Sequence, residues 1–166
     1  MRKQGKILIL IWWLYIALLF VFVVVKFKGS FYELSDRIDS YSSQGSVHYN
    51  LIPFRSVQTQ IKYITQWWAL KNLLGNIIPF IPFGFLLPIT YKKFSSAIKV
   101  LFVGLASILL IETFQFFTKL GSFDVDDIIL NMIGIVCGYL ICWVFNHIFI
   151  KERTANSYLP NRNRNR

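Results

Sequence analysis

Residues 73–91 read LLGNIIPFIPFGFLLPITY, and this stretch sets the class of the protein. It carries no charge, and as a helix rising about 1.5 Å per residue it would cross most of the ~30 Å hydrocarbon core of a bilayer. Pro79, Pro82 and Pro88 interrupt it, and each proline lacks an amide hydrogen and clashes with the carbonyl group four residues earlier. The sequence therefore predicts a membrane span that is kinked or re-entrant rather than one regular helix.

The carbonyl groups that lose their usual partners belong to Gly75, Ile78 and Gly84. At membrane depth, such backbone is tolerated only where it is buried in protein or lines a cavity. Two interpretations follow. Either neighbouring groups satisfy the carbonyls of an ordinary proline kink, or the carbonyls and Asn76 line a pocket together with Glu112.

Three further apolar stretches, residues 7–25, 97–117 and 128–150, are long enough to span a membrane. Hydrophobic residues make up 55% of the chain and charged residues 16%, against about a quarter charged in a typical soluble domain. The first stretch follows basic residues, as a signal peptide would, but it is longer than a signal core and no small-x-small cleavage site follows it. We therefore expect an all-α membrane protein with four transmembrane helices in one domain, residues 1–150. The first helix is retained and the second is broken by prolines.

The lysines and arginines indicate the orientation of the spans. With the N-terminus inside, most of the 18 lie in cytoplasmic segments, and this bias predicts that both termini are cytoplasmic. The basic tail, residues 151–166, ends in NRNRNR and is typical of a disordered segment near anionic lipid. Because the basic residues are divided between two membrane faces, the net charge of +10 does not indicate nucleic-acid binding.

The outer loop, residues 26–72, contains an amphipathic pattern. From Arg55 to Lys71, apolar residues recur at helical spacing, at Val57, Ile61, Ile64 and Trp68. Trp67 and Trp68 beside Lys71 would lie at the level of the lipid headgroups. We expect an interfacial helix on the outer leaflet, and a docking helix for a partner protein fits the pattern equally well.

Polar residues recur at one depth in three predicted spans. At about 1.5 Å per residue, Asn76, Glu112 and Asn131 all lie within roughly 4 to 8 Å of the outer boundary. A charged group at this depth costs about 1–3 kcal/mol unless it is paired. We therefore expect these side chains to face one another or a water-filled cavity rather than lipid.

Helical spacing adds neighbours to these groups. On the third span, Gln115 and Lys119 fall on the face of Glu112. A stripe on the fourth span begins polar and continues as glycines that let another helix approach closely: Asp127, Asn131, Gly134 and Gly138. The competing interpretation is structural, with interhelical hydrogen bonds and a pair between Glu112 and Lys119 or Asn76.

Four separated blocks are similar to the pattern of the VanZ-like family of bacterial membrane proteins. They are Asn50-Leu51-Ile52-Pro53-Phe54; Asn76 with Phe80-Ile81-Pro82-Phe83-Gly84 and Leu87; Glu112-x-x-Gln115; and Asp124-Val125-Asp126-Asp127 with Asn131-x-x-Gly134 and Gly138. The resemblance implies an integral protein of the bacterial cytoplasmic membrane. For the founding member it also implies lowered susceptibility to teicoplanin-type lipoglycopeptide antibiotics. It brings no established reaction and no catalytic residues.

Our first functional hypothesis is a non-catalytic module. It would change how a lipid-linked cell-wall precursor, or the acyl tail of a lipoglycopeptide, meets the outer leaflet. The candidate ligand-binding residues are Asn76, Pro82, Glu112, Gln115, Lys119, Asp124, Asp127 and Asn131.

The second hypothesis is an enzyme acting on a lipid phosphate or glycolipid, with Asp126 and Asp127 holding a divalent cation and Glu112 as general acid or base. An Asp-x-Asp-Asp string is a weak metal signal, and the sequence has no His–Cys cluster, serine elbow or glycine-rich phosphate loop. A small transporter or a scaffold is the third. We expect no cofactor and the lipid bilayer as partner, and the sequence leaves a homo-oligomer open.

Overall fold

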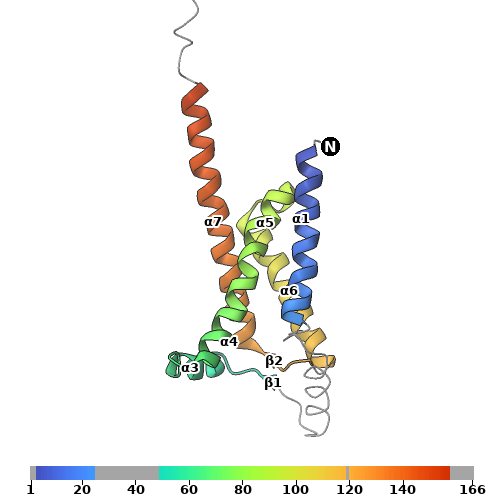
Figure 1. Ribbon diagram of the computed structural model, residues 1–166, viewed down its shortest axis with the longest axis vertical. Coiled ribbons are helices and arrows are strands. Elements are labelled where there is room, and N and C mark those ends of the chain that lie inside the picture. The colour runs from blue at the N-terminus through green and yellow to red at the C-terminus, as the bar shows by residue number, and fades with distance from the viewer. Residues whose placement is uncertain (1–2, 25–48, 119, 158–166) are drawn as a thin grey trace, which may run out of the picture.

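The computed structural model describes residues 3–24, 49–118 and 120–157 (Figure 1). Much of the predicted outer loop, the candidate residue Lys119 and the tail residues 158–166 lie outside the described residues. The elements in chain order are α1 (Lys3–Leu19), the π-helix η1 (Phe20–Val24), β1 (Tyr49–Asn50), α3 (Arg55–Lys62), α4 (Trp67–Ile77), the 3-10 helix η2 (Ile78–Phe80), α5 (Ile81–Thr90), the 3-10 helix η3 (Lys92–Phe94), α6 (Ala97–Phe117), β2 (Phe123–Asp124) and α7 (Val125–Ser157).

The prediction of four helical membrane spans is confirmed. The helical segments long and apolar enough to cross a bilayer are Gly5–Phe22, Trp67–Thr90, Ala97–Phe117 and Val125–Ile148. The described ends of α1 and α7 that lie nearest the termini are at the same end of the bundle, as an even number of spans requires (Figure 1). The helix α7 continues to Ser157, so it includes residues 151–157, which we expected in a disordered tail.

The second span follows the kinked alternative rather than the re-entrant one. The helices α4 and α5 continue one another through η2 and run from one end of the bundle to the other (Figure 1). Pro82 removes the usual partner of the Ile78 carbonyl, and the N–H of Ile81 donates to that carbonyl instead. The hydroxyl of Tyr15 on α1 donates to the carbonyl of Pro79 at 2.7 Å. Neighbouring groups therefore donate hydrogen bonds to the backbone carbonyls of Ile78 and Pro79 at the kink.

The predicted amphipathic helix from Arg55 to Lys71 is two helices, so this prediction is wrong in its second half. The helix α3 ends at Lys62, and α4 begins at Trp67 after a turn in which Gln66 is extended, with φ −86° and ψ 134°. Trp67 and Trp68 thus belong to the first turn of a membrane span. No glycine or proline marks the turn at 63–66, and the apolar spacing continues through it, so the sequence pattern concealed the break.

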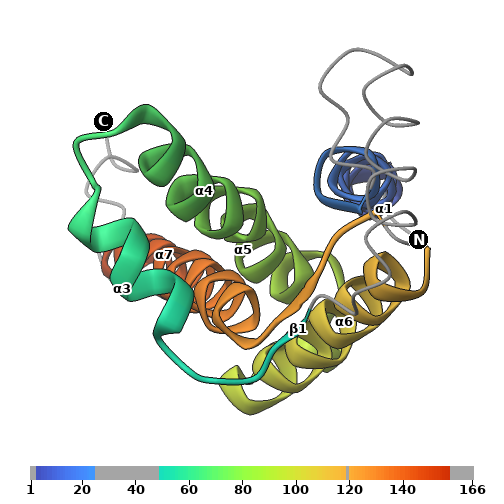
Figure 2. The ribbon, with the colours of Figure 1, turned by 90° about the horizontal axis from the view of Figure 1, so that it is seen from below.

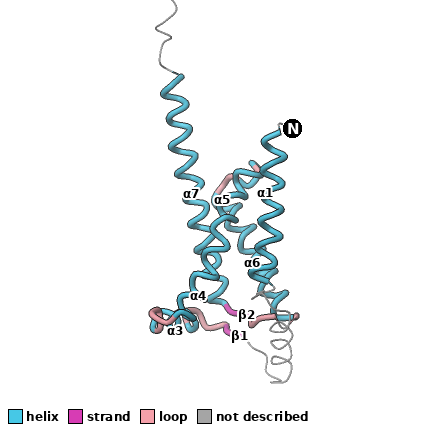
Figure 3. The backbone as a smooth tube through the Cα atoms, viewed as in Figure 1, coloured by secondary structure: helices cyan, strands magenta, loops and turns pink. Residues whose placement is uncertain are grey.

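The helix α5 lies at the centre of the bundle, where it contacts α1, α6 and α7. Seen from the end of the bundle at which α3 lies, the α4–α5 span lies between α7 and α1, with α6 alongside (Figure 2). We use "α3 end" for the end of the bundle where α3 and the strands β1 and β2 lie (Figure 3). There β1 and β2 pair in parallel, with Asn50 opposite Asp124.

The contact between α7 and the broken span is made backbone to backbone. A Cβ atom on Gly138 would overlap the carbonyl oxygen of Ile81, and one on Gly134 would overlap that of Ile77. From the other side, a Cβ on Gly84 would overlap the carbonyl oxygen of Ile135. The glycine stripe predicted on the fourth span is therefore the surface on which the second span packs.

Replacing Gly138 by alanine should test this packing. The added methyl group meets backbone that cannot rotate away, so we expect Gly138→Ala to lower the free energy of unfolding by about 1–3 kcal/mol. The matched control is Gly75→Ala in the same broken span, where an added Cβ meets nothing within 4 Å. Thermal unfolding of the purified proteins in detergent measures both, and equal unfolding temperatures would contradict the proposed contact.

Candidate functional site

Asp124 joins three elements at the α3 end. Its Oδ1 accepts a hydrogen bond from the backbone N–H of Asp126 at 2.9 Å, which is the N-cap arrangement for α7. The same oxygen accepts from Asn50 Nδ2 at 2.9 Å, and Oδ2 accepts from the Ser56 hydroxyl at 2.6 Å. Asn50 Nδ2 also donates to Ser56 Oγ at 3.1 Å. This network fixes β1 and the start of α3 to the start of α7.

Asp126 caps a different helix, α3. Its Oδ1 accepts from the N–H of Phe54 at 2.5 Å, and its Oδ2 accepts from the N–H groups of Ser56 and Val57 at 2.7 and 3.1 Å. The side chain of the N-cap residue Phe54 makes no cap hydrogen bond, and a carboxylate from far along the chain caps α3 instead. Phe54 adopts a left-handed backbone, φ 67°, and Asp126 is 0% exposed. The buried negative charge is therefore stabilised by three amide donors.

The next residue of α7 binds the second span. Asn76 Nδ2 donates to Asp127 Oδ1 at 2.5 Å, which ties α4 to α7. Spans two and four thus bring their polar groups together, as we predicted. Asp126 and Asp127 are neighbours on one turn of α7, so α3 and α4 are held by adjacent carboxylates.

The polar residues of the third span lie at the same level. On α6, Glu112 and Gln115 are buried, 2% and 1% exposed. The helices α6 and α7 run in opposite directions, and Gly104 meets the Ile135 side chain between them. Eight residues along each helix from that contact, about 12 Å, Glu112 reaches the level of Asp127. Asn76, Glu112 and Asp127 therefore lie at one level, whereas Asn131, which we predicted at that level, lies one turn further along α7.

Asn131 lies one turn deeper on α7 than Asp127 and is 1% exposed. Neither the nitrogen nor the oxygen of its side-chain amide has a hydrogen-bond partner within the described ranges 3–24, 49–118 and 120–157. Buried amides in proteins are almost always paired. Within these ranges, the Asn131 side chain therefore retains both a donor and an acceptor for a further group.

Three of the predicted residues, Pro82, Asp126 and Asp127, make contacts that serve the fold. Pro82 lies in the first turn of α5, where it has no N–H to donate to the carbonyl of Ile78 and so contributes to the kink. Asp126, proposed above as a cation ligand, accepts three backbone amides, and Asp127 accepts from Asn76. Among the described residues, no group of three or more His, Cys, Asp or Glu side chains is arranged to hold a metal ion.

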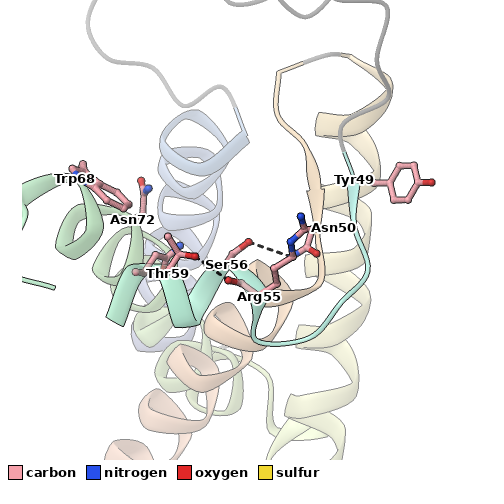
Figure 4. A pocket seen from close by; sticks show the side chains of 8 residues that line it. Tyr49, Asn50, Arg55, Ser56, Thr59, Trp68 and Asn72 are labelled. Carbon is pink, nitrogen blue, oxygen red and sulfur yellow. Dashed lines mark hydrogen bonds between the residues drawn. The ribbon is translucent and has the colours of Figure 1, made fainter. Parts of the chain in front are cut away.

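A polar pocket of about 450 Å³ opens at the α3 end (Figure 4). It is lined by residues from β1, α3 and α4: Tyr49, Asn50, Arg55, Ser56, Thr59, Gln60, Trp68 and Asn72. None of these is among the candidate residues we derived from the sequence. The available signal was the row of polar side chains on α3 opposite its apolar face, to which we assigned no site.

An apolar groove of about 230 Å³ lies on another side of α4. It is lined by Phe22 of η1 and by residues of the second span: Trp67, Leu70, Lys71, Leu74, Gly75, Ile78 and Pro79. The groove therefore begins in the first turn of α4 and extends to the proline kink. The polar pocket and the apolar groove share the N-terminal turns of one helix.

Two comparisons with known proteins agree. The sequence model of the VanZ/LLP1 family matches residues 12–146. The chain is 32% identical over 91 residues to Protein VanZ of Enterococcus faecium, an alignment that covers 53% of this chain and 56% of that protein. The chain thus spans little more than half the length of this relative. No solved structure matches the chain.

The capping role of Asp126 can be tested by amide hydrogen exchange. Asp126→Asn replaces one acceptor oxygen by an NH₂ group that faces backbone donors, so the amides of Ser56 and Val57 should lose about 1–3 kcal/mol of protection. Exchange is followed by mass spectrometry on the protein in nanodiscs. Gln58→Ala, an exposed change on the same helix, should leave these amides protected. Equal protection in the two variants would show that Asp126 does not hold α3.

Proposed function

The chain is a multi-pass membrane protein that belongs to the VanZ/LLP1 family, and from that premise we propose that it changes how an amphiphilic ligand meets the outer leaflet of the bacterial cytoplasmic membrane. The ligand is a teicoplanin-type lipoglycopeptide antibiotic or a lipid-linked cell-wall precursor. The protein binds this ligand rather than transforming it.

The observation that carries the proposal is the pairing of two cavities on α4. Trp68 and Asn72 line the polar pocket, whereas Trp67 and Lys71 line the apolar groove. Successive residues of a helix point about 100° apart, so the two cavities open on different faces of the same helix turns. An amphiphile needs this combination, because its headgroup and its acyl chain require surroundings of opposite polarity.

The predicted site residues then act mainly by positioning. Asp126 holds α3 and Asp127 holds α4 through Asn76, so the walls of the pocket stand at a fixed separation. Glu112 and Asn131 lie beneath them in the bundle. The enzyme alternative receives less support, because the two carboxylates proposed to hold a cation make hydrogen bonds that serve the fold.

The proposal requires the α3 end to face outward. A single thiol at Thr59, an exposed residue of α3, should react with a membrane-impermeant maleimide in intact cells. Cys137 and Cys142 are replaced by serine in this background. Labelling that occurs only after the cells are opened would place the α3 end inside and exclude the proposal.

The functional test compares an acylated glycopeptide with the same glycopeptide lacking its acyl chain. The purified protein in nanodiscs should bind the acylated compound several-fold more tightly than the unacylated one, and cells that express the protein should show lower susceptibility to the acylated compound alone. Gly75→Leu fills the apolar groove, since an added Cβ there meets nothing within 4 Å, and should abolish the difference. Gly5→Leu on α1, also in open surroundings, is the control.

Two outcomes would contradict the binding proposal. An equal change for acylated and unacylated compounds would show that the acyl chain is not recognised. A change in the envelope lipid profile of cells that express the protein would favour the enzyme alternative. If only the quantity of lipid-linked precursor retained by the purified protein responds to Gly75→Leu, the precursor is the ligand.

A further inference from the structure

Gln60 is the most informative residue of the polar pocket. It lies on α3, is only 7% exposed and lines the pocket. Its side-chain oxygen is buried and has no hydrogen-bond partner in the described part of the chain. A buried carbonyl acceptor left without a donor costs about 1–3 kcal/mol. A ligand that presents a hydroxyl or amide donor to this oxygen would recover that free energy.

The other polar groups of the pocket divide into two sets. Asn50 and Ser56 are occupied, since they bond to each other and to Asp124. Thr59, Asn72 and Arg55 line the pocket beside Gln60 and are exposed. The Thr59 hydroxyl donates to the carbonyl of Arg55 at 3.2 Å, so it offers a ligand an acceptor only. The ligand would therefore meet one hydroxyl oxygen, two amides and one guanidinium, a mixture of donors and acceptors.

This mixture fits a polyhydroxylated ligand better than an anion. Phosphate and carboxylate ligands favour clusters of cations or the N–H groups at a helix N-terminus. At α3 these N–H groups already donate to the Asp126 carboxylate, which would also repel an anion. Arg55 is the single cationic residue among those that line the pocket.

Trp68 supplies an apolar wall. Its ring is partly exposed and lies beside the Tyr63 ring, with 5.9 Å between the ring centroids, so the orientation of the indole is supported from one side. The large flat face of an indole packs against C–H groups. A sugar ring offers C–H groups on one face and hydroxyls around its edge, which matches Trp68 together with the amide groups.

We infer that the polar pocket of α3 and α4 binds a sugar ring of a glycosylated amphiphile. The volume of about 450 Å³ lies within the range of small-molecule sites, about 300–1,000 Å³. The inference rests on the proposed function, because it assumes that the α3 end meets an amphiphile at the outer leaflet. The sugar is carried by a lipoglycopeptide or by a glycolipid precursor.

The test uses the full chain in nanodiscs and ligand-observed saturation-transfer NMR. The probes are methyl β-D-glucoside, methyl N-acetyl-β-D-glucosaminide and inorganic phosphate, and empty nanodiscs give the background. We expect saturation transfer to at least one glycoside, with the sugar-ring protons receiving the most, and none to phosphate. Gln60→Leu and Trp68→Leu should each weaken glycoside binding by about tenfold, which corresponds to about 1.4 kcal/mol.

Two further variants keep the test decisive. Asn72→Ala alters an exposed lining residue without touching the buried contacts, and it should weaken glycoside binding even if Gln60→Leu fails to fold. Gln58→Leu, an exposed change on α3 outside the pocket, should leave binding unchanged. Glycoside binding that is absent, or that survives both Trp68→Leu and Asn72→Ala, would overturn the inference. Stronger binding of phosphate would assign the pocket to anions instead.

A competition experiment identifies the ligand that carries the sugar. A lipoglycopeptide whose sugars have been removed is set against the intact compound and against a short-chain glycolipid, each competing with the glycoside probe. Competition by the intact compound alone identifies the antibiotic, and competition by the glycolipid identifies a precursor. If the acyl-dependent effect in cells persists while no glycoside binds, the inference fails and the proposed function stands.

Discussion

The constraint on which this structure depends is that hydrocarbon supplies no hydrogen bonds, so every backbone group freed in a span must be paired by the chain itself. Pro82 frees the carbonyl of Ile78, and a 3-10 turn returns an N–H to it. Tyr15 on α1 reaches across to the carbonyl of Pro79. The prolines therefore do more than bend the span, because the kink they create binds α1 to α4 and α5 and leaves the apolar groove beside Pro79.

The same constraint explains why carboxylates gather at the α3 end. A short helix at the end of the bundle has N–H groups at its start that lack partners within the helix, and the side chain of its N-cap residue, Phe54, does not cap α3. Asp126 supplies the acceptor from the first turn of α7, where its own helix dipole also favours a negative charge. One buried carboxylate thus accepts hydrogen bonds from the N–H groups at the start of α3 and fixes the position of that helix. In the same way, Asp124 binds Asn50 of β1 and Asp127 binds Asn76 of α4.

The spans and the depth of their polar groups could be predicted from the sequence, because both depend on local quantities. Length and hydropathy determine which segments cross the membrane, and the helical rise brings polar groups of three spans to neighbouring levels, with Asn76, Glu112 and Asp127 at one level and Asn131 one turn further along α7. The break between α3 and α4 could not be predicted, since no glycine or proline marks residues 63–66. The position of α3 could not be predicted either, since the Asp126 carboxylate that caps its start lies more than 60 residues away. The pocket was missed for a related reason: its walls come from β1, α3 and α4, and contacts with Asp124 of β2 and Asp126 of α7, far along the chain, hold β1 and α3 in place.

Contacts with α7 also make the pocket rigid. Its two helical walls are held by consecutive residues of α7, and α7 is itself packed backbone to backbone on the second span through Gly134 and Gly138. A displacement of α7 would therefore move α3 and α4 together and would preserve their separation. Preorganisation of this kind lowers the entropy lost when a ligand binds. It matters most for a ligand held by a few hydrogen bonds and one aromatic face, since such contacts leave little free energy to reshape a site.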